Sequence, residues 1–368
     1  MNILFITDLY PVKNSEESTP KTLFDFTKEW EKIGHNVDVI KPNFILNSFL
    51  RGKPYYKSGK YEDIYNINYW TPFWFGVNRK ISRYCGNDDG FNVNNYDIVV
   101  AHMPSGILFA DKFGVPFVAG IHNSDIEVLT KPLYKIHFRN RLEKALKNAK
   151  AIACRSFVLR DKLIKLYPEF EKKTFVAPSG IDEKFIVKRS EPVLDNNLSI
   201  KILTCAHFKK RKNIDKVIKA CKGLESFELT VVGDGKDRKK LEKIDKTVKF
   251  LGHLAHDEVL AKMRESDVFI LPSIGETFGM VYLEAMASGC ITVCTKGDGI
   301  DGIIKNGENG FLTEPNVKSI QETLLNIKNL DAKVRNTICS NSFQVIQQYT
   351  SSKCANAYLQ QILRFCKD

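Results

Sequence analysis

The sequence predicts an α/β protein made of two doubly wound, Rossmann-like domains that face each other across a cleft. With 368 residues the chain is long enough to bury two cores. Short apolar runs alternate with amphipathic stretches, which is the pattern of βαβ units. This alternation stops at a polar stretch, 184–197, and starts again at Ser199. We therefore expect one domain over 1–185, a second over 198–345, and a helical end over 346–368.

The first domain opens with a βαβ unit. The apolar run 2–7 predicts a strand, and the helix expected over 20–33 has apolar residues spaced three, four and three apart, before Gly34 ends it and a strand follows at 37–40. Later apolar runs predict strands at 97–101, 116–121, 151–154 and from 175, and helices at 138–150 and 156–167.

The second domain repeats this alternation. Strands are expected at 199–206, 229–233, 248–251, 268–271 and 291–295, and helices at 214–221, 257–265 and 279–287. A dinucleotide-binding dehydrogenase would carry Gly-x-Gly-x-x-Gly after its first strand. Thr7-Asp-Leu-Tyr-Pro11 lacks that motif, and Gly233-Asp-Gly235 has no third glycine, so the dehydrogenase is disfavoured.

The stretch Leu271–Glu284 is the strongest functional signal. It leaves a buried strand through a loop and enters a helix at Gly279, so its ligand side is the carboxyl edge of a parallel sheet. Gly279 lets backbone N–H groups approach an anion, and the helix dipole favours negative charge there. Glu276 and Glu284 lie on either side, about 12 Å apart at the rise of a helix. A ligand that fits this arrangement has hydroxyls at both ends and phosphates between them, and a nucleotide-sugar has this shape.

The residues Glu276-Thr-Phe-Gly-Met-Val-Tyr-Leu-Glu284, followed by Ala-Met-Ala-Ser-Gly289, resemble the signature of the retaining glycosyltransferases of family 4, also called group 1. The resemblance implies the GT-B fold, with the final helix crossing back onto the first domain. It also implies that Glu284 binds ribose, Glu276 the sugar hydroxyls, and Lys212 with the amides after Gly279 the diphosphate of a UDP- or GDP-linked donor. The catalytic residues expected from it are Glu276, His122 and Lys212, and the donor-binding residues are Glu284, Gly279, Met280, Val281, His207, Arg211, Phe278 and Gly299.

Some positions depart from the family pattern. The usual arginine after the first strand of the second domain falls on His207, so either this histidine or one of Lys209, Lys210 and Arg211 takes its place. His122 resembles the histidine that relatives direct at the donor sugar, although a lone histidine at a strand end is also a common structural residue. The loop that contains Asp298 and Gly299 carries a variant that changes the donor contacts.

A net charge of +12 favours anionic partners. The segment 44–84 interleaves twelve aromatic residues with seven basic ones, which predicts either an anionic membrane surface with a lipid-linked acceptor or the core of the first domain. Nucleic-acid binding is disfavoured because no nucleic-acid-binding motif accompanies the charge. The nine cysteines, without metal-ligand spacing, and the lack of a signal peptide indicate a cytoplasmic protein, peripheral on the inner face of a membrane if the segment binds lipid.

These observations predict a retaining transferase that moves a hexose-type sugar from a nucleotide-sugar to a glycan or lipid-linked acceptor in cell-surface polysaccharide or glycoconjugate synthesis. No cofactor or metal is expected, because lysine and helix dipole neutralise the diphosphate and the chain has no Asp-x-Asp pair. Front-face and double-displacement mechanisms both remain open. The alternative is a non-catalytic nucleotide-sugar or glycan-binding protein of the same fold.

Overall fold

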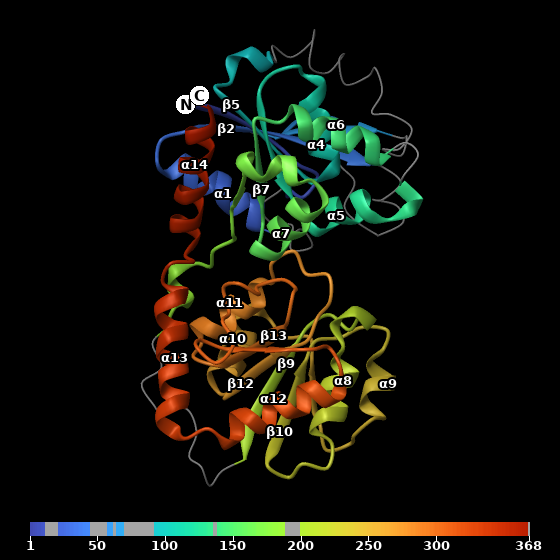
Figure 1. Cartoon of the computed structure of the whole chain (residues 1–368), viewed down its shortest axis with the longest axis vertical. Helices are drawn as coiled ribbons and strands as arrows, with labels where there is room; N and C mark the ends of the chain where they lie inside the picture. The colour runs from blue at the N-terminus through green and yellow to red at the C-terminus, as the bar shows by residue number, and fades with distance from the viewer. Residues whose placement is uncertain are drawn as a thin grey trace. The chain divides into compact units, whose positions relative to one another are not determined.

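The computed structural model describes residues 1–11, 21–44, 57–61, 64–69, 92–134, 138–187 and 199–366. The chain divides into two compact units (Figure 1). The first contains Met1–Arg155, Leu159–Pro178 and Ser351–Asp368, and the second contains Ser156–Val158 and Ser179–Thr350. The main segment of the second unit starts at Ser179, whereas 198 was expected from composition, and the last helix belongs to the first unit. Most of the stretch 184–197 lies outside the described residues.

The first unit is a mainly parallel sheet with the strand order β3-β4-β2-β1-β5-β6-β7-β8, in which only β3 is antiparallel. Its strands are β1 (Asn2–Ile6), β2 (Asn36–Phe44), β3 (Gly59–Tyr61), β4 (Ile64–Tyr69), β5 (Ile98–His102), β6 (Phe117–Ile121), β7 (Ala151–Cys154) and β8 (Thr174–Val176). Its helices are α1 (Thr22–Lys32), α4 (Met103–Lys112), α5 (Asn123–Thr130), α6 (Asn140–Asn148), α7 (Phe157–Leu166, which starts in the second unit) and α14 (Ser351–Cys366).

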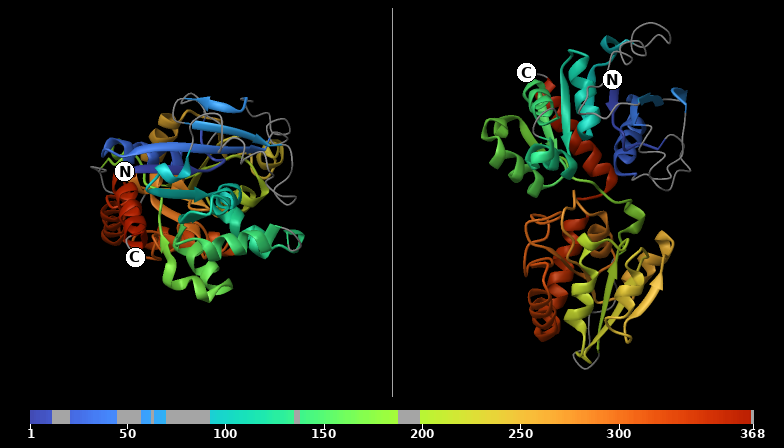
Figure 2. Two further views of the ribbon diagram at one scale, coloured as in Figure 1. Left: turned by 90° about the horizontal axis from the view of Figure 1, so that it is seen from above. Right: turned by 90° about the vertical axis from the view of Figure 1, so that its right-hand side faces the viewer.

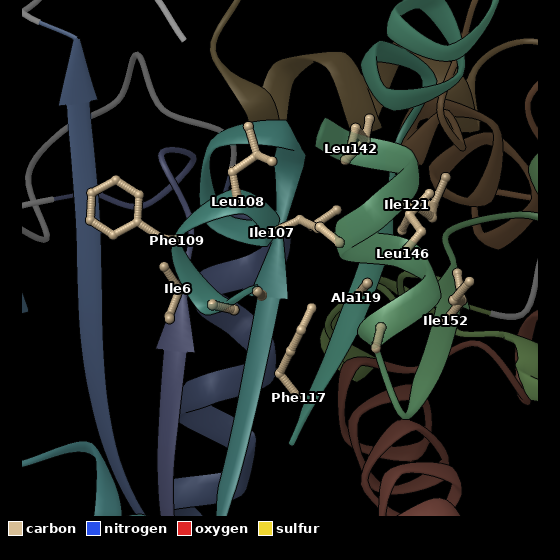
Figure 3. Close-up of a cluster of buried hydrophobic side chains, with 14 of the residues drawn as sticks. Ile6, Ile107, Leu108, Phe109, Phe117, Ala119, Ile121, Leu142, Leu146 and Ile152 are labelled. Carbon is tan, nitrogen blue, oxygen red and sulfur yellow. The ribbon is translucent and has the colours of Figure 1, made fainter. Parts of the chain in front are cut away.

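Alternate residues of β1 face opposite sides of this sheet. Leu4 and Ile6 join a core formed with α4 and α6, where Ile107, Leu142 and Leu146 meet strand residues such as Phe117 (Figure 3). Phe5 faces the other side, where α1 and α14 lie side by side (Figure 1). There Trp30 donates from its indole N–H to the carbonyl of Ala355 at 2.9 Å, which fastens α14 to α1.

The second unit is a parallel sheet with the order β11-β10-β9-β12-β13-β14. Its strands are β9 (Ile200–Cys205), β10 (Phe227–Val232), β11 (Lys249–Gly252), β12 (Val268–Leu271), β13 (Ile291–Thr295) and β14 (Phe311–Thr313). Its helices are α8 (Ile214–Cys221), α9 (Arg238–Glu242), α10 (His256–Arg264), α11 (Met280–Ala287), α12 (Val317–Asn329) and α13 (Ala332–Ile346). Val268 and Ile270 pack with α8 and α12, whereas Phe269 and Leu271 pack with α10 and α11, so helices cover both faces (Figures 1 and 2).

The predicted fold class, two doubly wound parallel sheets, is confirmed. Strands β7, β12 and β13 and helix α8 match the predicted residues, and β2 runs further than expected. The sequence reasoning missed α4 and α5, which follow β5 and β6, and the strands β3 and β4 within 44–84. The rest of that aromatic segment is outside the described residues. No helix in the described ranges combines the length and the apolar character that a membrane span needs.

Candidate active site

In each unit the strand order reverses at one point, between β1 and β5 in the first sheet and between β9 and β12 in the second. Ligands of open α/β sheets bind at such switch points, beyond the carboxyl ends of the strands. In the second unit the two loops at this point are 206–213, after β9, and 272–279, after β12. These loops contain most of the predicted site residues.

Hydrogen bonds tie the two loops together. Asn213 adopts a left-handed conformation, with φ of 53°, and its side-chain amide donates to the Pro272 carbonyl at 2.7 Å. The Ile274 N–H donates to the Arg211 carbonyl at 2.8 Å. The turn Lys210–Lys212 is thus held against the loop that contains Glu276, which explains why distant parts of the sequence form one site.

Glu276 accepts hydrogen bonds from three side chains. Lys212 Nζ lies 2.6 Å from Oε1, Arg211 donates to the same oxygen at 2.7 Å, and the Ser273 hydroxyl does so at 2.5 Å. Burial disfavours the charged carboxylate, but the charge and the hydrogen bond of Lys212 outweigh this and lower the pKa of Glu276. None of these donors reaches Oε2 within the described part of the chain, so this oxygen can accept from a ligand hydroxyl.

Asp298 holds the loop that contains Glu276, a role that the sequence did not indicate. Its two carboxylate oxygens accept from the backbone N–H groups of Gly275 and Glu276, each at 2.7 Å, and its side chain is only 8% exposed. The next residue, Gly299, has φ of 51°, and a Cβ there would lie 2.9 Å from the Phe278 carbonyl oxygen. The loop after β13 is therefore packed tightly against the Glu276 loop, and both carboxylate oxygens of its aspartate bind backbone N–H groups of that loop.

Gly279 precedes α11 and has φ of 94°, a conformation that favours glycine. A Cβ at this position would lie 2.5 Å from the Tyr282 ring, so the glycine is also needed for packing. Met280 and Val281 form the first turn of α11, where N–H groups have no partner within the helix. The Phe278 side chain is 3% exposed and belongs to the core, which leaves its backbone as the part that can contact a donor.

Glu284 lies on α11 and pairs with a residue that the sequence analysis did not single out. His256 Nε2, at the start of α10, is 3.1 Å from Glu284 Oε1. The hydrogen bond to this carboxylate raises the pKa of His256. Phe185 packs edge-on against the His256 ring at 5.0 Å between centroids. His256 is 28 positions away from Glu284 in the sequence, so only the folded structure identifies it as the partner of this carboxylate.

Arg211, one of the residues that could replace the usual arginine, contacts Glu276. His207, Lys209 and Lys210 are exposed and lie in the same loop, after β9. His207 lies close enough to Asp234 to lower the pKa of that carboxyl, although the backbone N–H of Gly235 and Arg238 contribute more. All four residues are exposed, and of the four it is Arg211 that has a hydrogen bond to Glu276 in the described part of the chain.

His122 belongs to the first unit, where it follows β6 and precedes α5. Its backbone N–H donates to Asp125 at 2.8 Å, and its Nε2 lies 3.0 Å from Nδ1 of His102. Burial, together with the nearby Arg155 guanidinium, lowers the pKa of His122 to about 3. The imidazole is therefore neutral at physiological pH and can act through hydrogen bonds rather than through charge.

Comparison with solved structures shows proteins of the same fold. HepE of Anabaena, solved in complex with UDP, matches with a TM-score of 0.73 at 18% identity, over 99% of this chain and 100% of the HepE chain. The architecture is that of the GT-B glycosyltransferases. Among sequences, MJ1178 of Methanocaldococcus jannaschii, described as an uncharacterized glycosyltransferase, is 25% identical over 312 residues, 81% of this chain and 84% of its own. The alpha-monoglucosyldiacylglycerol synthase of Acholeplasma laidlawii is 26% identical over 223 residues, 54% of this chain and 55% of its own.

Two family models match the chain, one for each half, and they meet within ten residues of the boundary at Ser179. Residues 20–185 match the model described as Glycosyltransferase Family 4, and residues 188–344 match Glycosyl transferases group 1. The chain belongs to this family, the group 1 or family 4 glycosyltransferases, as its Glu276–Glu284 motif predicted. The names of its homologues place them in polysaccharide and glycolipid biosynthesis, and the predicted class of function is confirmed at that level.

Proposed function

We propose that this protein is a retaining transferase that moves a hexose-type sugar from a UDP- or GDP-linked donor to a glycan or lipid-linked acceptor. The observation that carries the proposal is the state of Glu276. Its carboxylate is ionised, its Oε1 is held by Lys212, Arg211 and Ser273, and its Oε2 remains available. The free oxygen of Glu276 can accept a hydrogen bond from a sugar hydroxyl, and the neighbouring Lys212 and Arg211 carry the positive charge that an adjacent diphosphate needs.

The other residues take complementary roles. Glu284 accepts from the ribose hydroxyls, and the amides of Met280 and Val281 at the start of α11 face the phosphates. The Lys212 ammonium has three hydrogens and uses one for Glu276, so the others can meet a phosphate oxygen. These groups stabilise the negative charge that develops on the leaving diphosphate, which is the main electrostatic contribution to such a transfer. His122 donates or accepts a hydrogen bond at the sugar.

The donor class has support from a relative. HepE of Anabaena was solved with UDP and with UDP-glucose, and the match to its fold covers 99% of this chain. A site of this kind has no need of a divalent cation when lysine and helix dipole supply the positive charge.

For the acceptor we propose a glycan or a lipid-linked molecule, at the cytoplasmic face of a membrane. The name of the Acholeplasma relative includes a glycolipid product. The basic and aromatic segment 44–84 suits anionic headgroups, each basic residue near the surface contributing about 1 kcal/mol. Flotation with anionic and with neutral liposomes, at low and high salt, tests this surface. Equal and negligible binding to both would assign the aromatic residues to the core and point to a soluble acceptor.

A panel of UDP- and GDP-sugars tests the central proposal. Release of nucleoside diphosphate identifies the donor, and proton NMR of the new glycoside gives its anomeric configuration, which we expect to equal that of the donor. Glu276→Gln should retain nucleotide binding and lose turnover. Nucleotide binding without turnover in the unmodified protein, with any acceptor offered, would favour the non-catalytic alternative, and an inverted product would refute retention.

A further inference from the structure

A chain of hydrogen bonds runs through the first unit from the C-terminal helix to His122. The Tyr358 hydroxyl, on α14, lies 3.0 Å from Nε2 of His102, at the end of β5. Nδ1 of His102 lies 3.0 Å from Nε2 of His122, at the end of β6. Tyr358 and His102 are almost completely buried and His122 is 7% exposed. The last helix of the chain thus reaches a predicted catalytic histidine through one intermediate ring.

The surroundings of His102 are shaped to hold its imidazole in one position. Gly120 is its neighbour across the β5–β6 pair, and a Cβ at Gly120 would lie 2.0 Å from Nδ1 of His102. The ring of Phe5 stacks on the other side at 5.2 Å between centroids. Met103, the next residue, has φ of 68°, a strained conformation for a residue with a side chain. Such strain is typical of functional sites, and here it occurs at the switch point of the sheet.

The network determines where its protons lie. Burial lowers the pKa of both histidines, and the charge of Arg155 adds to this effect, so each ring carries one proton. Among the described residues, His102 is the hydrogen-bond partner of the Tyr358 hydroxyl. If Tyr358 accepted from His102, its own proton would be buried without an acceptor, which is unfavourable. Tyr358 therefore donates to Nε2 of His102, which places the His102 proton on Nδ1. That proton points to Nε2 of His122.

We propose that Tyr358 and His102 are positioning residues that hold His122 in the tautomer protonated at Nδ1, so that His122 offers a hydrogen-bond donor to an oxygen of the transferred sugar. The part that concerns the sugar rests on the proposed function. The part that concerns the tautomer rests on the hydrogen-bond geometry and on the neutral state of the two buried rings, and is independent of that function. The C-terminal helix thereby sets the hydrogen-bonding character of a histidine that is more than two hundred positions away in the sequence.

Long-range proton–nitrogen NMR of protein labelled with ¹⁵N-histidine at pH 7.5 tests the tautomer, with His102→Gln and His122→Gln to assign the signals. We expect both histidines of the unmodified protein to be protonated at Nδ1. In Tyr358→Phe, which keeps the packed ring, the two nitrogens of His102 should report a mixture of tautomers, and His122 should follow. Tyr96→Phe is the control, because it removes another tyrosine hydroxyl bond, to Asp38, beyond the opposite end of β5, and should leave both histidines unchanged.

Protonation of His122 at Nε2 in the unmodified protein would overturn the proposal, even if Tyr358→Phe failed to fold. Unchanged tautomers in folded Tyr358→Phe would overturn it as well. In the transferase assay Tyr358→Phe should lower kcat about fivefold, the effect of one ordinary hydrogen bond, without changing the affinity for nucleoside diphosphate. A chain that shows the tautomers but no transfer with any donor refutes the proposed function alone.

Discussion

Asp298→Asn should separate the positioning of Glu276 from the binding of nucleotide. The carboxylate accepts from the N–H groups of Gly275 and Glu276, each at 2.7 Å. An asparagine of the same shape keeps one acceptor and turns an NH₂ group toward the other N–H. The loss of one hydrogen bond to a buried charged group lowers the free energy of unfolding by about 1.5–3 kcal/mol. For a unit of this size the melting temperature should then fall by about 3–12 °C.

The same substitution releases the backbone that aims the Glu276 carboxylate. A displacement of about 1 Å at such a group can reduce turnover about 100-fold. We therefore expect kcat to fall about 10- to 100-fold, while the Kd for nucleoside diphosphate stays unchanged because Glu284 and the start of α11 are not touched. Calorimetry gives the melting temperature and the Kd, and the transferase assay gives kcat.

Asp301→Asn is the matched control. Asp301 lies in the same loop and accepts from the Gly297 N–H at 2.6 Å, so its substitution removes the same kind of bond without reaching the Glu276 loop. It should lower stability less, because Asp301 is less buried than Asp298, and leave kcat unchanged. Equal kcat values for the two variants would refute the assignment of Asp298 as the residue that positions Glu276.

Three further predictions concern the same site. Glu284→Ala and Lys212→Ala should each weaken binding of nucleoside diphosphate by about 1.5–3 kcal/mol in calorimetry, and unchanged affinity in both would contradict their roles. Transfer should survive excess EDTA, because Lys212 and the start of α11 supply the positive charge; complete loss restored by Mg²⁺ or Mn²⁺ would contradict this. Glu284→Gln should lower the pKa of His256 toward 6.5 in an NMR titration, since the carboxylate raises it. Because the His256 side chain is half exposed, the pair stabilises the fold by less than about 1 kcal/mol. This contribution is fully present below the unfolded pKa of about 6.5 and is lost as pH rises through the folded pKa of His256.

The fold and the centre of the site could be predicted because local patterns encode them. The apolar run 268–271 is followed first by a loop and then by Gly279. This order of residues is enough to predict a strand, a loop at the switch point and a helix. By contrast, α4 was missed because the whole stretch 98–121 is apolar enough to hide the change from strand to helix periodicity. Strands β3 and β4 were missed because aromatic and basic residues there suggest a surface as readily as a core.

The partners within the site could not be predicted, because tertiary structure chooses them. Asp298 is separated from Glu276 by 22 positions, and in the sequence it is one of two aspartates in a glycine-rich loop. His102 ends an apolar strand as many structural histidines do, and its contact with Tyr358 on α14 appears only in the folded structure. His256 opens a helix, where a polar residue is expected in any case.

The structure also changes how the predicted roles relate to one another. The sequence assigns Lys212 to the phosphates and Glu276 to the sugar, as independent groups. At 2.6 Å, with both side chains 14% exposed, the two are one charged pair, and Lys212 is the cation that keeps Glu276 ionised despite its burial. Removing Lys212 should therefore raise the pKa of Glu276 and also weaken the binding of the diphosphate. The energetic contributions of the two residues cannot be added, since each sets the state in which the other acts.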